Sequence, residues 1–275
     1  MARGLCKLCE LEDFADASLR TLIRSAYAGP AEHDSTFPDG REYRKLWEVA
    51  MSLRAFRALG LLGTGKFLGI GAGAEPTLFW LTSRSRCVVA TDLYDEEAWG
   101  GQAPATMLTN PGLHATCPWD PRRLAVKRMD ARELQFADAS FDGVFSASAI
   151  EHFGDYDDVR QALTEMRRVL RPGGIAAIST EYRLDGPGPG LPGSLMFDHS
   201  ELLSTLGVGT ALWQLVEPID LTISERTLQT IVDFDEAVSD VKALRDWSTY
   251  PHIVLRHSSG VTWTSVHVVL RRAGF

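Results

Sequence analysis

The first sixty residues carry apolar positions at helical spacing. One set follows the i, i+3, i+4, i+7 pattern and comprises Leu19, Leu22, Ile23 and Ala26. After a polar break, a second set comprises Leu46, Ala50, Leu53 and Phe56. Such stripes are typical of amphipathic helices, and the glycines at positions 60 and 63 end the second one. We therefore predict an N-terminal helical cap over residues 1–64.

The period of the pattern changes at residue 65. Short apolar runs now alternate with helical stripes such as those at 75–82 and 159–170. The runs, each a predicted strand, are 66–70, 87–92, 124–127, 141–146 and 175–180. Strands that alternate with helices at this spacing indicate βαβ crossovers, and hence a parallel sheet with helices on both faces. The predicted fold class is α/β.

The C-terminal third has a different pattern. Residues 212–219 and 261–270 are predicted strands, and 253–256 pairs with the latter across a turn, which favours an antiparallel edge. Between them a helical stripe comprises Phe234, Val238, Val241, Leu244 and Trp247. We predict one domain over residues 65–275 with a lid-like helical insertion at about 221–250. Packing of this helix on the sheet and a homodimer contact are the alternatives.

Composition narrows the class of protein. The chain has 275 residues, of which 45% are hydrophobic and 23% charged, as in ordinary globular proteins. No window reaches the roughly 18 uninterrupted apolar residues of a membrane-spanning helix, and the N-terminus lacks the apolar core of a signal peptide. A net charge of −8 argues against a nucleic-acid or anionic-membrane surface. We expect a cytoplasmic protein that binds neither nucleic acid nor membrane.

The cysteines number 4, too few for a disulfide scaffold. Cys6 and Cys9 have half of a zinc-finger spacing, but no second Cys or His pair follows at ligand spacing. We therefore expect no metal, and two free thiols near a mobile end of the chain.

A glycine-rich turn follows the first predicted strand of the parallel sheet. The turn consists of Gly69, Ile70, Gly71, Ala72 and Gly73. Glycines allow the backbone to approach a ligand closely. Asp92 ends the next strand, where a carboxylate can accept hydrogen bonds from both hydroxyls of a ribose. Together they predict a nucleotide cofactor at the carboxyl edge of the sheet, and they leave NAD(P) and S-adenosylmethionine as alternatives.

Three further segments have the order and spacing of a known family. They are residues 129–136 with the continuation at 137–142, residues 148–153, and the Arg-Pro-Gly-Gly run at 171–174. With the glycine turn, they give a run that resembles class I S-adenosylmethionine-dependent methyltransferases, particularly the small-molecule branch. The resemblance covers residues 64–182. It implies a Rossmann-like, mostly parallel sheet of about seven strands with an antiparallel last strand.

The resemblance also implies cofactor-binding roles for individual residues. It places the segment 69–73 against the methionine and ribose portions of S-adenosylmethionine, and Asp92 at the ribose hydroxyls. The other residues with an implied contact are Leu93 and Ala131 at the adenine ring, Asp130 at the adenine amino group, and Ser146 at the amino-acid moiety.

Two positions depart from the family pattern. Gly69 stands where the family usually has an Asp or Glu that helps to hold the methionine portion. Glu75 stands where it usually has Gly. Glu48 and Glu75 itself are candidates to replace the missing acid.

Polar residues after the fourth and fifth strands are candidates for the methyl-transfer step. Such enzymes work chiefly by positioning the reactants and excluding water, and a general base is needed only where the acceptor must lose a proton. His152 follows the fourth strand and titrates near neutrality, so it is the candidate base, with a purely pocket-shaping role as the alternative. Glu181 ends the fifth strand and is a second candidate for contact with the substrate.

These observations predict an S-adenosylmethionine-dependent methyltransferase that acts on a small-molecule or saccharide acceptor. Oxygen is favoured as the acceptor atom because His152 could take a proton from a hydroxyl. One alternative is a catalytically inactive binding subunit with the same fold, which the glycine at position 69 suggests. The other is an NAD(P)-dependent oxidoreductase that uses the same glycine turn.

Overall fold

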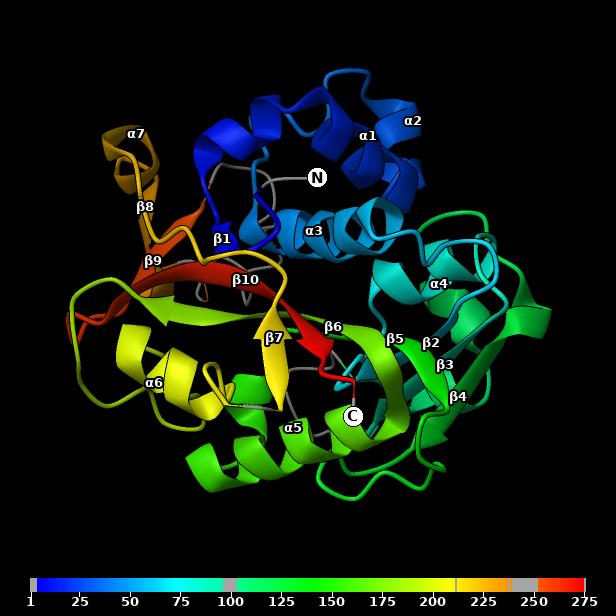
Figure 1. The fold of residues 1–275 in the computed structure, drawn as a ribbon. Coiled ribbons are helices and arrows are strands. Elements are labelled where there is room, and N and C mark those ends of the chain that lie inside the picture. Colours follow the sequence, from blue (N-terminus) through cyan, green and yellow to red (C-terminus); the bar gives the residue numbers. More distant parts are fainter. Residues whose placement is uncertain (1–3, 96–102, 211, 237, 239–251, 275) are drawn as a thin grey trace.

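In the computed structural model, residues 4–95, 103–210, 212–236, 238 and 252–274 are described. Their strands form one sheet in the order β4-β3-β2-β5-β6-β10-β9-β8, and β1 and β7 also pair with β10 (Figure 1). The strand bounds are β1 Lys7–Leu8, β2 Lys66–Ile70, β3 Cys87–Asp92, β4 Leu124–Arg128, β5 Phe141–Ala147, β6 Leu170–Arg183, β7 Trp213–Leu215, β8 Ile231–Asp233, β9 Val254–Arg256 and β10 Thr262–Arg272.

The centre of the sheet confirms the predicted fold class. Strands β4, β3, β2, β5 and β6 are parallel neighbours, and β10 is antiparallel to β6 along most of its length. The sheet has 10 strands among the described residues, more than the seven expected, because β1, β8 and β9 are short additions at its edge. The strand expected at 212–219 is also shorter than predicted, since it ends at Leu215 and the nearby Pro218 cannot donate to a ladder.

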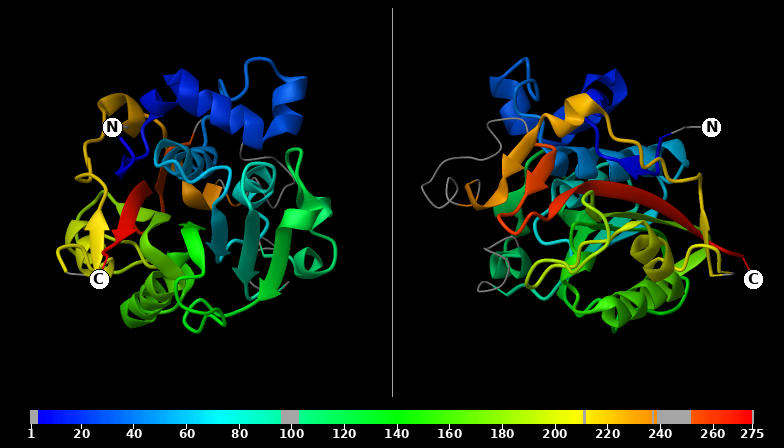
Figure 2. Two further views of the ribbon diagram at one scale, coloured as in Figure 1. Left: turned by 45° about the vertical axis from the view of Figure 1, so that its right-hand side comes forward. Right: turned by 90° about the vertical axis from the view of Figure 1, so that its left-hand side faces the viewer.

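The outer edge of β10 is shared by three short strands from distant parts of the chain. β9 pairs with its start, β1 with its middle and β7 with its end. In the right-hand view of Figure 2, β10 is the long red strand that crosses the molecule. The N-terminal segment therefore contributes a strand to the sheet as well as helices.

The pairing of β1 overturns the expectation that Cys6 and Cys9 lie near a mobile end. Both thiols are free and buried, and the Val269 N–H donates to Cys6 Sγ at 3.2 Å. Burial raises the pKa of Cys6 to about 11 and also raises the pKa of Cys9. Two thiols in such surroundings act as small apolar core side chains. No group of residues in the described ranges has the make-up of a metal site.

Helices cover both faces of the sheet. Figure 1 places α1 to α4 on one face and α5 and α6 on the other. The helix bounds are α1 Ala17–Ala26, α2 Ala28–His33, α3 Arg44–Ala58, α4 Pro76–Thr82, α5 Tyr156–Val169, α6 His199–Thr205 and α7 Glu225–Leu228. The predicted helical cap therefore lies over the sheet, with α3 as its innermost helix.

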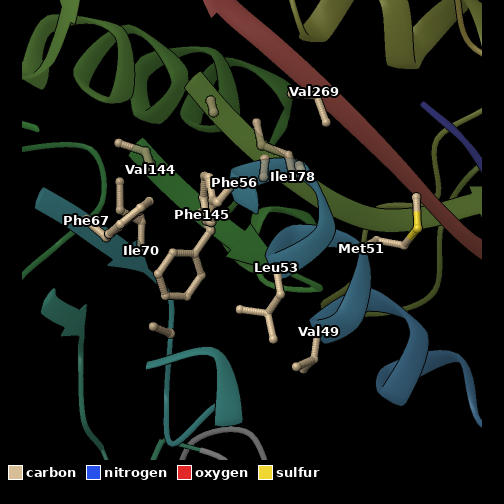
Figure 3. Close-up of a cluster of buried hydrophobic side chains, with 14 of the residues drawn as sticks. Val49, Met51, Leu53, Phe56, Phe67, Ile70, Val144, Phe145, Ile178 and Val269 are labelled. Atoms are coloured by element: carbon tan, nitrogen blue, oxygen red, sulfur yellow. The ribbon is translucent and has the colours of Figure 1, made fainter. Parts of the chain in front are cut away.

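Apolar side chains of α3 form the main contact between this cap and the sheet. Figure 3 shows Leu53 and Phe56 of α3 beside Phe67 of β2 and Phe145 of β5. The ring centroid of Phe56 lies 4.7 Å from that of Phe67 and 6.3 Å from that of Phe145. Aromatic pairs at such distances add to the stabilisation from area burial. The contact holds the last turns of α3 against β2 and β5.

The insertion predicted at about 221–250 lies partly outside the described residues. Its described part contains α7 and β8, followed by helical residues at 234–236 and 238. Residues 239–251, which hold most of the predicted lid helix, fall outside the described ranges. The lid and the division at residue 64 stay predictions. In the described part of the chain, no helix has the length and apolar character needed to cross a membrane.

Candidate active site

The glycine turn and Asp92 meet at the carboxyl edge of the sheet, as expected. The Gly73 N–H donates to Asp92 Oδ2 at 2.9 Å, and the Leu93 N–H donates to Oδ1 at 2.7 Å. Gly71 and Gly73 have φ angles of +58° and +44°, which glycine adopts without strain. Burial raises the pKa of Asp92 even though these backbone donors act against it. The carboxylate therefore orders the turn and remains at the edge where a ribose would lie.

Gly69 lies where no side chain fits. A Cβ there would be 2.7 Å from Phe145 Cζ and 2.8 Å from Ala72 Cβ. Ile70 and Ala72 are buried beside it. The absence of the family's acid at this position thus has a steric cause, because the Phe145 ring fills the space beside the strand.

We expect Gly69→Ala to lower the free energy of unfolding by about 1–3 kcal/mol, the usual cost of overpacking a core. Urea denaturation measures it. Gly29→Ala is the matched control, since a Cβ at Gly29 meets nothing within 4 Å and its helical position tolerates alanine. Equal stability of both variants would contradict the steric account.

The other predicted cofactor residues take different environments. Leu93 is 52% exposed, an apolar side chain open to a ligand, whereas Ala131 is buried. The Asp130 carboxylate accepts from the Arg132 guanidinium at 2.7 Å and from the Arg132 N–H at 2.8 Å. Arg132 thereby lowers the pKa of Asp130. Ser146 is fully buried, and its Oγ has no partner within the described ranges.

His152 lies in a short 3₁₀ helix, η6 (Ile150–His152), after β5. Its Nδ1 is 2.9 Å from the Gly193 carbonyl oxygen. A carbonyl only accepts, so Nδ1 carries the proton and Nε2 is the basic nitrogen. Burial lowers the pKa of His152 below its ordinary value. The imidazole is therefore neutral near pH 7.

Glu181, near the end of β6, forms a buried ion pair that the sequence did not predict. Arg44 Nη1 lies 2.7 and 2.8 Å from its two carboxylate oxygens, and Lys45 Nζ lies 3.4 Å from Oε1. Burial alone would raise the pKa of Glu181, but the two cations hold it below its ordinary value. The predicted contact of Glu181 with substrate stays a prediction.

Glu48 of α3 joins this network. It is 1% exposed and lies 3.3 Å from Arg44 and 3.2 Å from Lys45. The Ser148 hydroxyl donates to it at 2.8 Å, and the Ser265 hydroxyl also donates to it. Arg44 and Lys45 were not among the site residues predicted from the sequence. The available signal was the charged pair Arg44 and Glu48 at i and i+4 of an otherwise apolar helix, a spacing that indicates a polar contact.

Two further carboxyl groups at this edge lack part of their hydrogen bonding. Glu151 is 1% exposed and accepts from Thr180 at 2.8 Å, while its Oε1 has no partner in the described part of the chain. Burial and the charge of Glu181 raise the pKa of Glu151 to about 8. Glu75 Oε2 also lacks a partner there, and burial raises the pKa of Glu75 well above its ordinary value.

Part of the chain is similar to known methyltransferases. Residues 68–178 match the family described as "Methyltransferase domain". The chain is 26% identical over 172 residues to "Methyltransferase GfsG" of Streptomyces halstedii, which covers 62% of this chain and 57% of that protein. It is 34% identical over 98 residues to "O-methyltransferase resE" of Aspergillus sclerotiorum, 36% of each protein. The matched parts thus span 57% of GfsG and 36% of resE, so this chain covers less than two thirds of either relative.

Solved structures agree on the fold. The "[4+2]-Cyclase SpnF" superposes with a TM-score of 0.56 at 16% identity and covers 94% of this chain and 97% of that one. A putative sarcosine dimethylglycine methyltransferase from Galdieria sulphuraria gives 0.54 at 15% identity, with 83% and 85% covered. The match over residues 68–178 and the shared fold are consistent with a class I S-adenosylmethionine-dependent methyltransferase domain, for which S-adenosylmethionine is the expected cofactor.

The residues at the carboxyl edge fit this cofactor. Carboxylates outnumber cations there, and S-adenosylmethionine carries a sulfonium and an ammonium group that such a surface attracts. The exposed Leu93 offers an apolar contact, and Ser146 Oγ and Glu75 Oε2 are polar atoms that still lack partners among the described residues. The match to a methyltransferase family therefore favours S-adenosylmethionine over NAD(P) as the cofactor.

Proposed function

We propose that the protein methylates a hydroxyl oxygen of a small molecule or sugar. The names of two relatives support oxygen: resE, and "O-methyltransferase rstn1" of Aspergillus nomiae, which is 50% identical over 50 residues, or 18% of this chain and 21% of that protein. The observation that carries the proposal is the contact between His152 Nδ1 and the Gly193 carbonyl.

His152 is the proposed general base. S-adenosylmethionine supplies an electrophilic methyl group when it is bound. The Gly193 carbonyl holds the His152 ring in the tautomer that leaves Nε2 basic, so Nε2 takes the proton of the acceptor hydroxyl. Arg44 and Lys45 of α3 hold the Glu181 carboxylate near enough for its charge to act on His152.

Replacing His152 by Gln is expected to lower kcat by roughly 10²-fold or more, the usual contribution of a general base. S-adenosylhomocysteine affinity should stay within about twofold, because the proposed role involves the acceptor and not the cofactor. Steady-state kinetics and titration calorimetry measure the two quantities. His199→Gln, an exposed histidine at the start of α6, is the matched control. An unchanged kcat in His152→Gln would exclude the base.

The pH profile gives an independent check. Only the neutral imidazole accepts a proton, so kcat/KM should rise with pH and level off above the pKa of His152. Because burial lowers that pKa, the rising limb should lie below 6.5. A limb above this value would point to another group, such as Glu151.

The acceptor atom can be identified with methyl-labelled S-adenosylmethionine and a panel of phenols, aliphatic alcohols and free sugars. The position of the label in the product is then read by NMR. Label on oxygen supports the proposal, and label on nitrogen or carbon overturns it.

The second candidate function is a non-catalytic binding subunit. Gly69 favours it, because the position of the family's acid is closed by Phe145. Cofactor binding by the pure protein separates this candidate from the first. A homodimer stays a prediction that sedimentation would test.

A further inference from the structure

Glu75 lies two residues after the glycine turn, and its side chain has no structural role that its hydrogen bonds reveal. Its N–H donates to the Ala72 carbonyl at 3.0 Å, and it is the N-cap residue of α4, but its side chain forms no cap hydrogen bond. The side-chain oxygen Oε2 is buried and has no partner within the described ranges. A carboxylate that is buried without a partner is strongly disfavoured in its charged form.

The surroundings of Glu75 strengthen this effect. Beyond burial, the negative charge of Glu48 raises its pKa most, with smaller contributions of the same sign from Asp92 and Glu151. Lys45 acts in the opposite direction, but its ammonium group is already shared between Glu48 and Glu181 at 3.2 and 3.4 Å. The titratable groups that face Glu75 are Lys45 and Glu48 of α3, Tyr27 after α1, Asp92 and Tyr94 at the end of β3, and Glu151 of η6.

The neighbouring carboxyl groups are already hydrogen-bonded to side chains. Glu48 accepts from Ser148 and Ser265, and Glu151 accepts from Thr180. No acid can stand at Gly69, because a Cβ there would collide with the Phe145 ring. Glu151 Oε1 also lacks a partner in the described part of the chain, but Glu151 belongs to η6, whereas Glu75 follows the glycine turn by two residues. Glu75 is therefore the carboxyl group with a partnerless oxygen that lies nearest to this turn along the chain.

We propose that Glu75 binds the ammonium group at the amino-acid end of S-adenosylmethionine and releases its own proton to solvent when that cation arrives. The inference rests on the cofactor assignment and adds to it a residue that the family pattern does not supply. The O–H bond of the Glu75 carboxyl group breaks, the proton passes to the buffer, and the ammonium group keeps its protons. No covalent bond forms between Glu75 and the cofactor.

Titration calorimetry with S-adenosylhomocysteine tests this exchange. Runs in buffers of different ionisation enthalpy report the number of protons released, which should approach one for the unaltered protein at pH values where its free Glu75 is protonated. Binding should strengthen as pH rises, up to about tenfold per unit, until Glu75 is ionised in the free protein. Glu75→Gln should release none and bind roughly 10- to 100-fold more weakly.

Two controls separate this role from general damage. 5′-Methylthioadenosine lacks the amino-acid end, so it should bind Glu75→Gln and the unaltered protein equally well. Glu151→Gln should retain most of the proton release, since Glu151 accepts from Thr180. Without ligand, Glu75→Gln should unfold at the same temperature or higher, because it removes an acid that caps nothing and whose Oε2 is buried without a partner among the described residues.

The outcomes distinguish the inference from the assignment beneath it. If S-adenosylhomocysteine fails to bind the unaltered protein, both fall. If it binds without proton release, or if Glu75→Gln still releases a proton, only the role of Glu75 is overturned. A Glu75→Asp variant that keeps proton release with weaker affinity would support the charge as the recognised feature.

Discussion

Asp92→Ala is expected to raise the dissociation constant for S-adenosylhomocysteine by roughly 10²–10⁴-fold. Each hydrogen bond to a charged group contributes about 1.5–3 kcal/mol, and the ribose would lose two of them. The substitution also removes the acceptor of the Gly73 and Leu93 N–H groups, at 2.9 and 2.7 Å. The glycine turn would then lose the contact that orders it before the cofactor arrives.

Titration calorimetry with S-adenosylhomocysteine measures this effect, with NADH and NADPH as comparison ligands. Asp92→Asn should lose less, because its amide oxygen still accepts one hydrogen bond. Asp138→Ala is a matched control, since that carboxylate is 75% exposed and pairs with Arg168 away from the glycine turn. An affinity unchanged by Asp92→Ala would remove Asp92 from the ribose site. Absence of binding by the unaltered protein would favour the non-catalytic subunit.

The carboxyl edge of the sheet could be predicted because it follows from local patterns. A glycine turn after one strand and an acid at the end of the next must meet if the strands are parallel neighbours. The contact between Gly73 and Asp92 is the observed result. The loop that supplies Gly193 to His152 could not be placed in this way, since a Gly-Pro-rich segment has no periodicity that fixes its path.

The buried ion pair of Arg44 and Glu181 illustrates what sequence patterns omit. The helical stripe of α3 shows which face is buried, but it does not name the partner, which lies 137 positions away. The same limit applies to β1, because a strand of 2 residues is too short to show an alternating pattern. The end of β7 near Pro218 was accessible to sequence reasoning, since proline cannot continue a paired strand.

Arg44→Met is expected to lower the free energy of unfolding by about 3–5 kcal/mol at neutral pH, the usual cost of breaking a buried ion pair. Arg44 and Glu181 are 4% and 5% exposed, so the carboxylate left behind cannot recover its hydration. Lys45, at 3.4 Å from Glu181, compensates only in part. Methionine is chosen because it fills a similar space without charge. Urea denaturation measures the loss.

The stability difference between Arg44→Met and the unaltered protein should depend on pH. In the unaltered protein the folded pKa of Glu181 is lowered, so its pairing stabilises the fold above the unfolded pKa and is lost as pH falls through the folded value. In Arg44→Met the folded pKa is raised instead, and the variant loses stability as pH rises above about 4.3. The difference between the two proteins should therefore be small at acidic pH and largest near neutrality.

The double variant Arg44→Met with Glu181→Gln completes the test. It removes the Glu181 charge, while Glu48, the other partner of Arg44, keeps Lys45 at 3.2 Å and the hydroxyls of Ser148 and Ser265. The double variant should therefore regain most of the stability that the single variant loses, because replacing both members of a buried pair is often neutral. A double variant as unstable as Arg44→Met, or a stability difference independent of pH, would show that Arg44 acts through packing alone. The recovered stability thus measures how far the charge of Glu181, and not the volume of Arg44, holds α3 over the carboxyl edge.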